Sequence, residues 1–285
     1  MALVSPARDR SSFESVDALS AGALGFMPRL LVLTTLPHRR TDSYRFERIN
    51  GRHRLRLSAP RRVGLPYGSY SRLIVVYLTT EAVRTKSAEI HLGTSPNDLA
   101  RRLRLSVISG LRGTAHRLED QLRRLRSTRF IWQTSLGLHP TSSGSGFVTS
   151  DCHSLMRMAR ELLPKRSVWR SRVVLGQNFF EEITRSAIPV DLRAIRQLQR
   201  SPLAIDLYVW LTYRMSYLRK PCLISWENLQ AQFGADYGRL RDLRRKVLAH
   251  LENVLDVYPA VRVGKPDSGL RLYPSPPHVQ ARPHR

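Results

Sequence analysis

The sequence predicts an α+β fold that is mainly helical, in which one order of elements occurs twice. Two long runs, residues 70–83 and 201–218, repeat apolar side chains at helical spacing. A short apolar strand, a short helix, a turn and a basic helix follow each run, and strand-like segments come after them. Because one such set needs about 80–110 residues, a chain of 285 residues holds two.

Residues 1–60 are expected to be an N-terminal tail followed by a β-hairpin extension. The chain is small and polar up to about residue 23, as chain ends often are, and residues 27–38 form an apolar, β-like run. The dipeptide Asn50-Gly51 accepts positive φ at both central positions of a type I′ turn. Residues 44–57 are therefore expected to form a hairpin.

Residues 61–176 are expected to form the first unit. An insertion at 139–165 begins in a Gly/Ser-rich stretch and continues as a helix over 153–163. Outside the insertion, the expected helices and strands lie at residues 70–83, 88–93, 96–105, 111–127, 129–136 and 167–176.

Residues 177–285 are expected to form the second unit, with residues 177–190 as a connector. Ser225 is positioned to cap a short helix that Gly234 ends, and the basic helix follows. The expected elements after the connector lie at residues 201–218, 222–225, 226–233, 237–255 and 256–275. A helix pair followed by a two-stranded hairpin is the order of a winged helix. The sequence thus predicts two tandem winged-helix domains with short β-hairpin wings.

The charge of the chain limits the classes of partner. Lys and Arg number 47 and Asp and Glu 22, a formal net charge of +25, which favours a polyanion. The longest apolar run is interrupted at Pro28 and Arg29, so no membrane-spanning helix is expected. The two cysteines lack metal-ligand spacing, and neither a disulfide framework nor a metal site is expected.

The basic helix at 237–255 is the strongest candidate for a DNA-binding element. Taken alone, a solvated surface would be the commoner explanation of its charge. Three features favour DNA: its first turns are low in acid, it is the second helix of a helix–turn–helix, and a basic hairpin follows it. The candidate DNA-binding residues of helix and wing are Tyr237, Arg239, Arg241, Asp242, Arg244, Arg245, Lys246, Arg262, Lys265 and Arg271.

Some of these residues allow a second role. Asp242 could accept from a cytosine amino group, or it could orient Arg239 or Arg245 through a helix-spaced pair, which is the commoner case. Arg244 lies at the edge of the apolar stripe and could extend outward. Four aromatic residues of the helix at 201–218 could suggest base stacking, but their spacing favours the core: Tyr208, Trp210, Tyr213 and Tyr217.

The corresponding helix of the first unit, residues 111–127, has a mixed charge pattern. Its outward-facing basic residues are expected to be Arg112, His116, Arg117, Arg123 and Arg124, with Glu119 and Asp120 among them. Contact with the DNA backbone and contact with protein are both open for this helix.

Catalytic layouts are missing from the sequence. It has no GxxxxGK[ST] loop for a nucleotide, no pair of histidines suited to a metal-dependent nickase and no carboxylate cluster for two metals. The sequence therefore predicts a protein without enzymatic activity, metal or cofactor. An origin-nicking enzyme is a weaker alternative.

Four segments carry a resemblance to a known family: "LPYGSYSRLIVVYLTTEAVRTKSAEIHLG", "PVDLRAIRQLQRSPLAIDLYVWLTYRMSYLRKP", "WENLQAQFGADYGRLRDLRRKVL" and "SGLRLYPSPPHV". The chain resembles the plasmid-encoded RepA family of replication initiators over roughly residues 24–279. The resemblance implies a tandem winged-helix protein that binds repeated sites in double-stranded plasmid origin DNA, helps to open it, and recruits the host initiator and replicative helicase.

The resemblance also implies a homodimer through the first winged helix, and a location in the bacterial cytoplasm with its plasmid. A repressor that binds DNA without initiating replication is the main alternative, because it would share the fold. An RNA-binding or membrane-surface protein that uses the charge alone is a further one.

Overall fold

The structure is a computed structural model that contains both helices and strands, as predicted for an α+β protein. It describes residues 18–110, 113–135, 147–150, 156–157, 169, 172–234 and 237–279. Most of the expected tail, most of the insertion at 139–165, and Arg112 lie outside the described residues.

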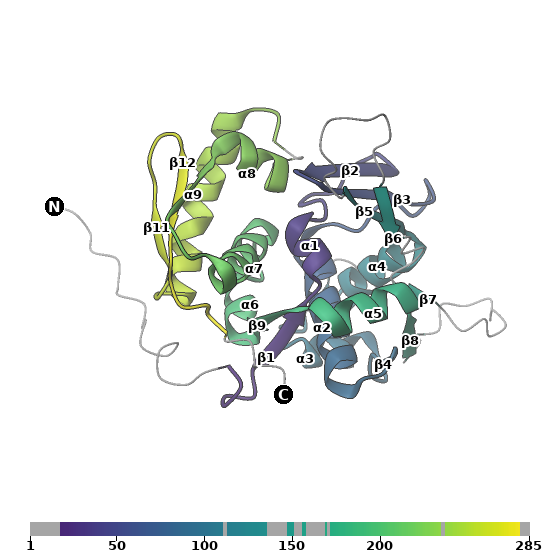
Figure 1. Ribbon diagram of the computed structural model, residues 1–285. Helices are drawn as coiled ribbons and strands as arrows, with labels where there is room; N and C mark the ends of the chain where they lie inside the picture. The colour runs from purple at the N-terminus through teal and green to yellow at the C-terminus, as the bar shows by residue number, and fades with distance from the viewer. Residues whose placement is uncertain are drawn as a thin grey trace.

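The C-terminal elements lie where the sequence predicted them. They are α7 (Pro202–Tyr217), β10 (Cys222–Ser225), α8 (Trp226–Phe233), α9 (Leu240–Val257), β11 (Arg262–Gly264) and β12 (Gly269–Tyr273). Ser201 and Ser225 cap α7 and α8 by accepting the backbone N–H groups of Ala204 and Asn228 at 3.2 and 3.3 Å. The three strands form one antiparallel sheet in the order β10-β12-β11, beside α8 and α9 (Figure 1).

The first half divides its strands between two sheets. Its helices are α2 (Gly68–Thr85), α3 (Pro96–Arg102) and α4 (Thr114–Ser127). One sheet has the order β2-β3-β5-β6, with β2 (Arg45–Asn50), β3 (His53–Ser58), β5 (Arg129–Ser135) and β6 (Phe147–Ser150). The other has the order β4-β8-β7, with β4 (Glu89–His91), β8 (Arg172–Leu175) and β7 (Met156–Arg157).

Two expectations for the first half are therefore corrected. The strand-like runs at 129–136 and 167–176 do not pair as a hairpin: β5 joins the N-terminal hairpin β2–β3, whereas β8 joins β4. Within the helix expected at 153–163, Met156–Arg157 is a strand that pairs with β8. Both differences arise from pairings between segments distant in the sequence, which local patterns do not reveal.

The N-terminal segment and the expected connector also differ from prediction. The apolar run at 27–38 starts at the last residue of strand β1 (Leu24–Met27) and continues as helix α1 (Arg29–Leu33). Residues 177–190 form α5 (Gln177–Ser186) and the start of β9 (Ile188–Asp191), and α6 (Leu192–Leu198) follows. Phe179 and Ile183 of α5 are buried one helical turn apart, which stabilises a helix against the core. Because β1 pairs with β9, the N-terminal end of the described chain is joined to the second half.

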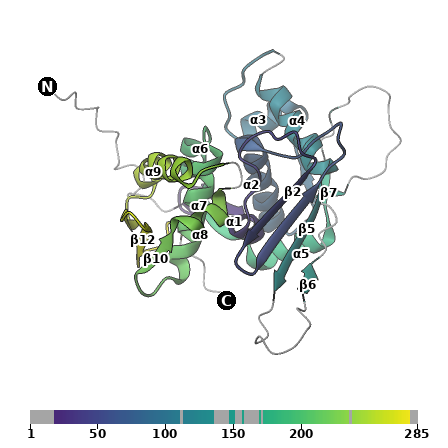
Figure 2. The same ribbon diagram turned by 90° about the horizontal axis from the view of Figure 1, so that it is seen from above.

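A single core runs through both halves. Figures 1 and 2 show α2 and α7 near the centre, with α9 and the C-terminal sheet on one side and the β2-β3-β5-β6 sheet on the other. Tyr208 and Trp210 of α7 are buried, as their spacing predicted, whereas Tyr217 at the end of the helix is 44% exposed.

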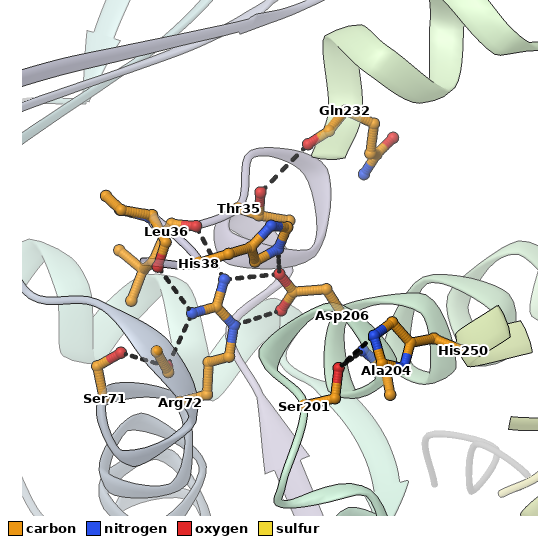
Figure 3. A network of polar contacts seen from close by, with 12 residues as sticks. Thr35, Leu36, His38, Ser71, Arg72, Ser201, Ala204, Asp206, Gln232 and His250 are labelled. Carbon is orange, nitrogen blue, oxygen red and sulfur yellow. Dashed lines mark hydrogen bonds and ion pairs between the residues drawn. The ribbon is translucent and has the colours of Figure 1, made fainter. Parts of the chain in front are cut away.

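Polar contacts fix the second half against the first (Figure 3). Arg72 of α2 forms a bidentate ion pair with Asp206 of α7, and the Nε2 atom of His38 lies 2.8 Å from the Asp206 Oδ2 atom. The Gln232 side chain at the end of α8 donates to the Val32 carbonyl at 2.6 Å, and its backbone carbonyl accepts from Thr35 at 3.2 Å. The helix pair α8–α9 is thus held at a defined position beside the N-terminal segment.

Candidate nucleic-acid interface

Helix α9 separates its apolar and basic residues onto two faces. Leu243, Val247, Leu251, Val254 and Val257 are fully buried at three- and four-residue spacing. On the other face, Arg239, Arg241 and Arg245 are exposed. The buried stripe anchors the helix. The guanidinium groups near the N-terminal end of α9 therefore project into solvent from a fixed support.

The exposed arginines differ in their intramolecular contacts. The Arg245 side chain is 75% exposed and its Nη2 atom lies 3.7 Å from the Asp242 Oδ1 atom, an ion pair at helical spacing. This contact favours the expectation that Asp242 orients Arg245. Arg239 and Arg241 make no ion pair within the described part of the chain, and Lys246 is half-buried. Arg239, Arg241 and Arg245 are therefore all open to a ligand, and Arg245 is the one that an acidic side chain of α9 orients.

Arg244 connects the helix to the turn of the hairpin. Its Nη2 atom lies 2.5 Å from the Asp267 Oδ1 atom, and its guanidinium lies over the Trp226 ring at 5.5 Å. The Trp226 indole N–H donates to the Asp267 carbonyl at 2.7 Å. This arrangement joins α8, α9 and the β11–β12 turn, so Arg244 positions the hairpin in this structure.

The basic residues of the hairpin occupy separate positions. Lys265 forms an ion pair with Glu252 of α9, which ties the hairpin to the helix a second time. Arg262 lies over the Tyr273 ring at 5.5 Å and remains exposed. Arg271 on β12 is also exposed. The outer surface of the hairpin can therefore supply two guanidinium groups to a phosphate backbone.

Tyr237 lies just before α9 and is close to the N-terminal segment. The Arg39 guanidinium lies 5.8 Å from the centre of its ring, and the His38 ring lies 6.4 Å away. Arg39 and Arg40 are exposed. Sequence reasoning did not include these two arginines, because the approach of residues 38–40 to α9 depends on contacts across about 200 residues of sequence. The adjacent Arg-Arg pair was the one local signal.

The first-half helix α4 exposes most of the described basic side chains that were predicted, and Arg126 in addition. His116 and Arg117 are exposed, and Arg123 is exposed but paired with Asp120 at 2.8 Å. The expectation that Arg124 faces outward is wrong. Its side chain is 8% exposed, because it pairs with Asp120 at 2.7 Å and donates to the Leu65 carbonyl at 3.2 Å.

The pKa of Asp120 reflects these contacts. Burial acts to raise the pKa of this carboxyl, but hydrogen bonds from Arg124 and Arg123 outweigh the burial and lower it. The carboxylate is thus stabilised in its charged form, and Arg124 is a structural residue of the first half.

The described residues contain neither a metal cluster nor a membrane span. Within them, no three His, Cys, Asp or Glu side chains are grouped as metal ligands would be. None of the helices in the same residues is both long and apolar enough to cross a bilayer.

The fold has a counterpart among solved structures. The crystal structure of SeMet derivatives of domain 2 and domain 3 of RctB is similar with a TM-score of 0.54 and 13% sequence identity, and the match covers 89% of this chain and 99% of that one. A second structure, RctB domains 2–3, matches with a TM-score of 0.49 at 14% identity over 86% of this chain and 95% of that chain. At this identity the first likeness defines the fold alone.

The sequence comparison defines the family. The family described as plasmid encoded RepA protein matches residues 65–228, more than half of the chain. The chain therefore belongs to the plasmid-encoded RepA family of replication initiators. The match includes α2 to α7 and ends within α8, so α9 and its arginines follow the matched segment. A comparison with curated proteins found no significant match.

Proposed function

We propose that this protein initiates plasmid replication by binding repeated sequences in the plasmid origin as double-stranded DNA, helping to open the origin and recruiting host replication proteins. The observation that carries the proposal is the exposed basic face of α9, where Arg241 and Arg245 project from a helix anchored by a buried stripe. Membership of the RepA family supplies the initiator role.

The C-terminal elements support a winged helix as the reading unit. In that arrangement α8 and α9 are the helix pair, α9 enters the major groove with its N-terminal part, and the β11–β12 hairpin lies against the backbone. Arg241 and Arg245 would contact base edges, while Arg239, Lys246 and the exposed residues Arg262 and Arg271 would hold phosphates.

We propose that the first half is a modified winged helix. It has the order α2, β4, α3, α4 and β5, but β4 pairs with β8 and β5 pairs with β3, so its strands depart from a simple wing. The mixed charges of α4 suit a protein contact, such as a homodimer, better than a base-reading surface. The host initiator, the replicative helicase and a bacterial cytoplasmic location belong to the same proposal.

A repressor without initiation activity is the second candidate, since the same arrangement of α8 and α9 would serve it. A replication assay separates the two. A plasmid carrying only this gene and its flanking repeats should replicate with the wild-type chain and fail with Arg241→Ala/Arg245→Ala. If the wild-type chain bound the repeats but the plasmid did not replicate, the repressor would remain as the function. If the chain did not bind the repeats, both the initiator and the repressor would be excluded. Supercoiled origin DNA with a divalent metal should give no nicked product, because we propose no enzymatic activity.

A further inference from the structure

The outward face of the β2-β3-β5 sheet is strongly basic and has no part in the site at α9. The register places Arg45, Ser58 and Arg129 in one row across the three strands. The next row holds Glu47, Arg56 and Ile131, and the one after it Ile49, Arg54 and Gln133. Because directly opposed residues share a face, all of these side chains point to one side of the sheet.

This face is open to solvent and rigidly supported. Arg45, Arg56 and Arg129 are exposed, and Ile49 among them is 48% exposed. The opposite face packs Leu55, Leu57 and Phe130 into the core at 1% exposure or less. Arginines on this sheet are therefore presented at spacings that the strands fix, about 4.8 Å between strands and about 6.6 Å along them.

The outward residues of β2, β3 and β5 include four arginines and one carboxylate. The carboxylate is Glu47, and it is shared by Arg56 at 2.7 Å and Arg54 at 3.6 Å. The register places no two of these arginines directly opposite each other, but a surface built for solubility alone usually mixes both signs. An accumulation of guanidinium groups with so little acid is typical of a surface that meets a polyanion.

We infer that the outward face of the β2-β3-β5 sheet binds the phosphate backbone of duplex DNA, as a second contact surface separate from α9. The three strands place no aromatic side chain on this face, where single-strand binding surfaces stack bases. Tyr44, at its margin, is already covered by Arg61 at 4.7 Å and Arg45 at 5.5 Å. The contact would thus be to phosphates and independent of sequence.

The sheet lies beside the reading helices. Asn50, at the end of β2, donates to the Gln232 side chain at the end of α8 at 2.9 Å, and Figure 1 shows β2 next to α8. This inference rests on the proposed function in one respect, which is that the polyanion is taken to be DNA. A contact of this kind would add affinity for DNA around the origin site without adding sequence preference.

The test compares Arg45→Gln/Arg56→Gln/Arg129→Gln with a control that loses the same charge elsewhere. The control is Arg84→Gln/Arg101→Gln/Arg185→Gln, whose arginines are exposed on α2, α3 and α5. Affinity for a duplex of unrelated sequence is measured over a range of salt concentrations, after circular dichroism shows that both variants are folded. The salt slope should become flatter by about 0.9 for each lost phosphate contact in the sheet variant, so by up to about three, and stay at the wild-type value in the control.

Equal slopes in the two variants would overturn the inference, because net charge alone would then explain binding. A loss confined to single-stranded DNA or to anionic vesicles would also overturn it, since the surface would serve another ligand. The preference for origin repeats over unrelated duplex should be unchanged in the sheet variant and lost in Arg241→Ala. If the wild-type chain lacked that preference, the proposed function would fail. The salt slope of the sheet variant on unrelated duplex would still test the present inference.

Discussion

Arg72 on α2 and Asp206 on α7 form a buried, bidentate ion pair between the two halves of the molecule. The Arg72 Nε and Nη2 atoms each lie 2.7 Å from an Asp206 oxygen, and both side chains are at most 2% exposed. The remaining donors of Arg72 reach the carbonyls of Leu36, Pro37 and Gly68. The guanidinium is thus fully paired, which is the condition under which a buried charge is tolerated.

Breaking this pair should destabilise the whole chain. Asp206→Asn leaves a buried guanidinium without its counter-charge, and we expect the free energy of unfolding to fall by about 3–5 kcal/mol. Arg72→Met should cost a similar amount, and the double variant Arg72→Met/Asp206→Asn should lose less than the sum of the two. Denaturant unfolding of the four proteins measures this. Additive losses would mean that the two side chains act independently.

His38 should make stability dependent on pH. Burial lowers the pKa of its imidazole below the usual value near 6.5, and the hydrogen bond with Asp206 opposes this without overcoming it. The unfolded chain therefore binds the proton more readily than the folded one. The contribution of His38 to the free energy of unfolding should therefore be fully present above about pH 6.5. It should be lost as the pH falls towards the pKa of His38 in the folded chain.

The variant His38→Gln tests this assignment, because its amide can still donate to Asp206 but does not titrate. Unfolding measured between pH 5 and 8 should show a weaker pH dependence than in the wild-type chain. Some dependence should persist, since burial also lowers the pKa values of His53, His250 and His278. Identical pH profiles for the two proteins would show that His38 contributes nothing.

Adjacent arginines on α4 should behave differently. Arg124 is buried and hydrogen-bonded to the Leu65 carbonyl, so Arg124→Ala should lower the free energy of unfolding by about 1–3 kcal/mol. Arg123 is exposed, and Arg123→Ala should cost less than about 1 kcal/mol. Thermal or denaturant unfolding compares the two. The reverse ranking would contradict the placement of Arg124 inside the first half.

Asp267 should affect DNA binding through the hairpin. It is exposed at the turn and pairs with Arg244, so Asp267→Asn removes a surface ion pair and should change stability by less than about 1 kcal/mol. Loss of the pair also frees the turn, and dissociation from origin DNA should become faster although a negative charge has been removed. Faster association with unchanged dissociation would indicate that Asp267 merely repels DNA.

The second half could be predicted closely from sequence because its signals are local. Ser225 caps α8, Gly234 ends it, and the leucine and valine spacing of α9 defines its buried face. The same spacing assigned Arg241 and Arg245 to the opposite, exposed face. These patterns need no knowledge of distant segments.

The features that the sequence did not predict depend on distant partners. Arg124 lies next to the buried residue Leu125 on α4, and its burial depends on the distant Leu65 carbonyl as well as on the local pair with Asp120. Helix α1 is too short for periodicity to separate it from a strand. The basic face of the β2-β3-β5 sheet appears only after β5 pairs with β3, about 75 residues away in the sequence.

Sequence-specific reading by α9 is the central claim, and competition binding tests it most directly. Labelled origin repeats are displaced from wild-type, Arg241→Ala, Arg245→Ala and Arg84→Ala proteins by unlabelled origin duplex or by a scrambled duplex of equal length. An arginine that contacts guanine contributes about 1–3 kcal/mol of discrimination, so the two α9 variants should lose preference for the repeats while Arg84→Ala keeps it. If both α9 variants retained wild-type affinity and preference, α9 would not be the element that reads the origin.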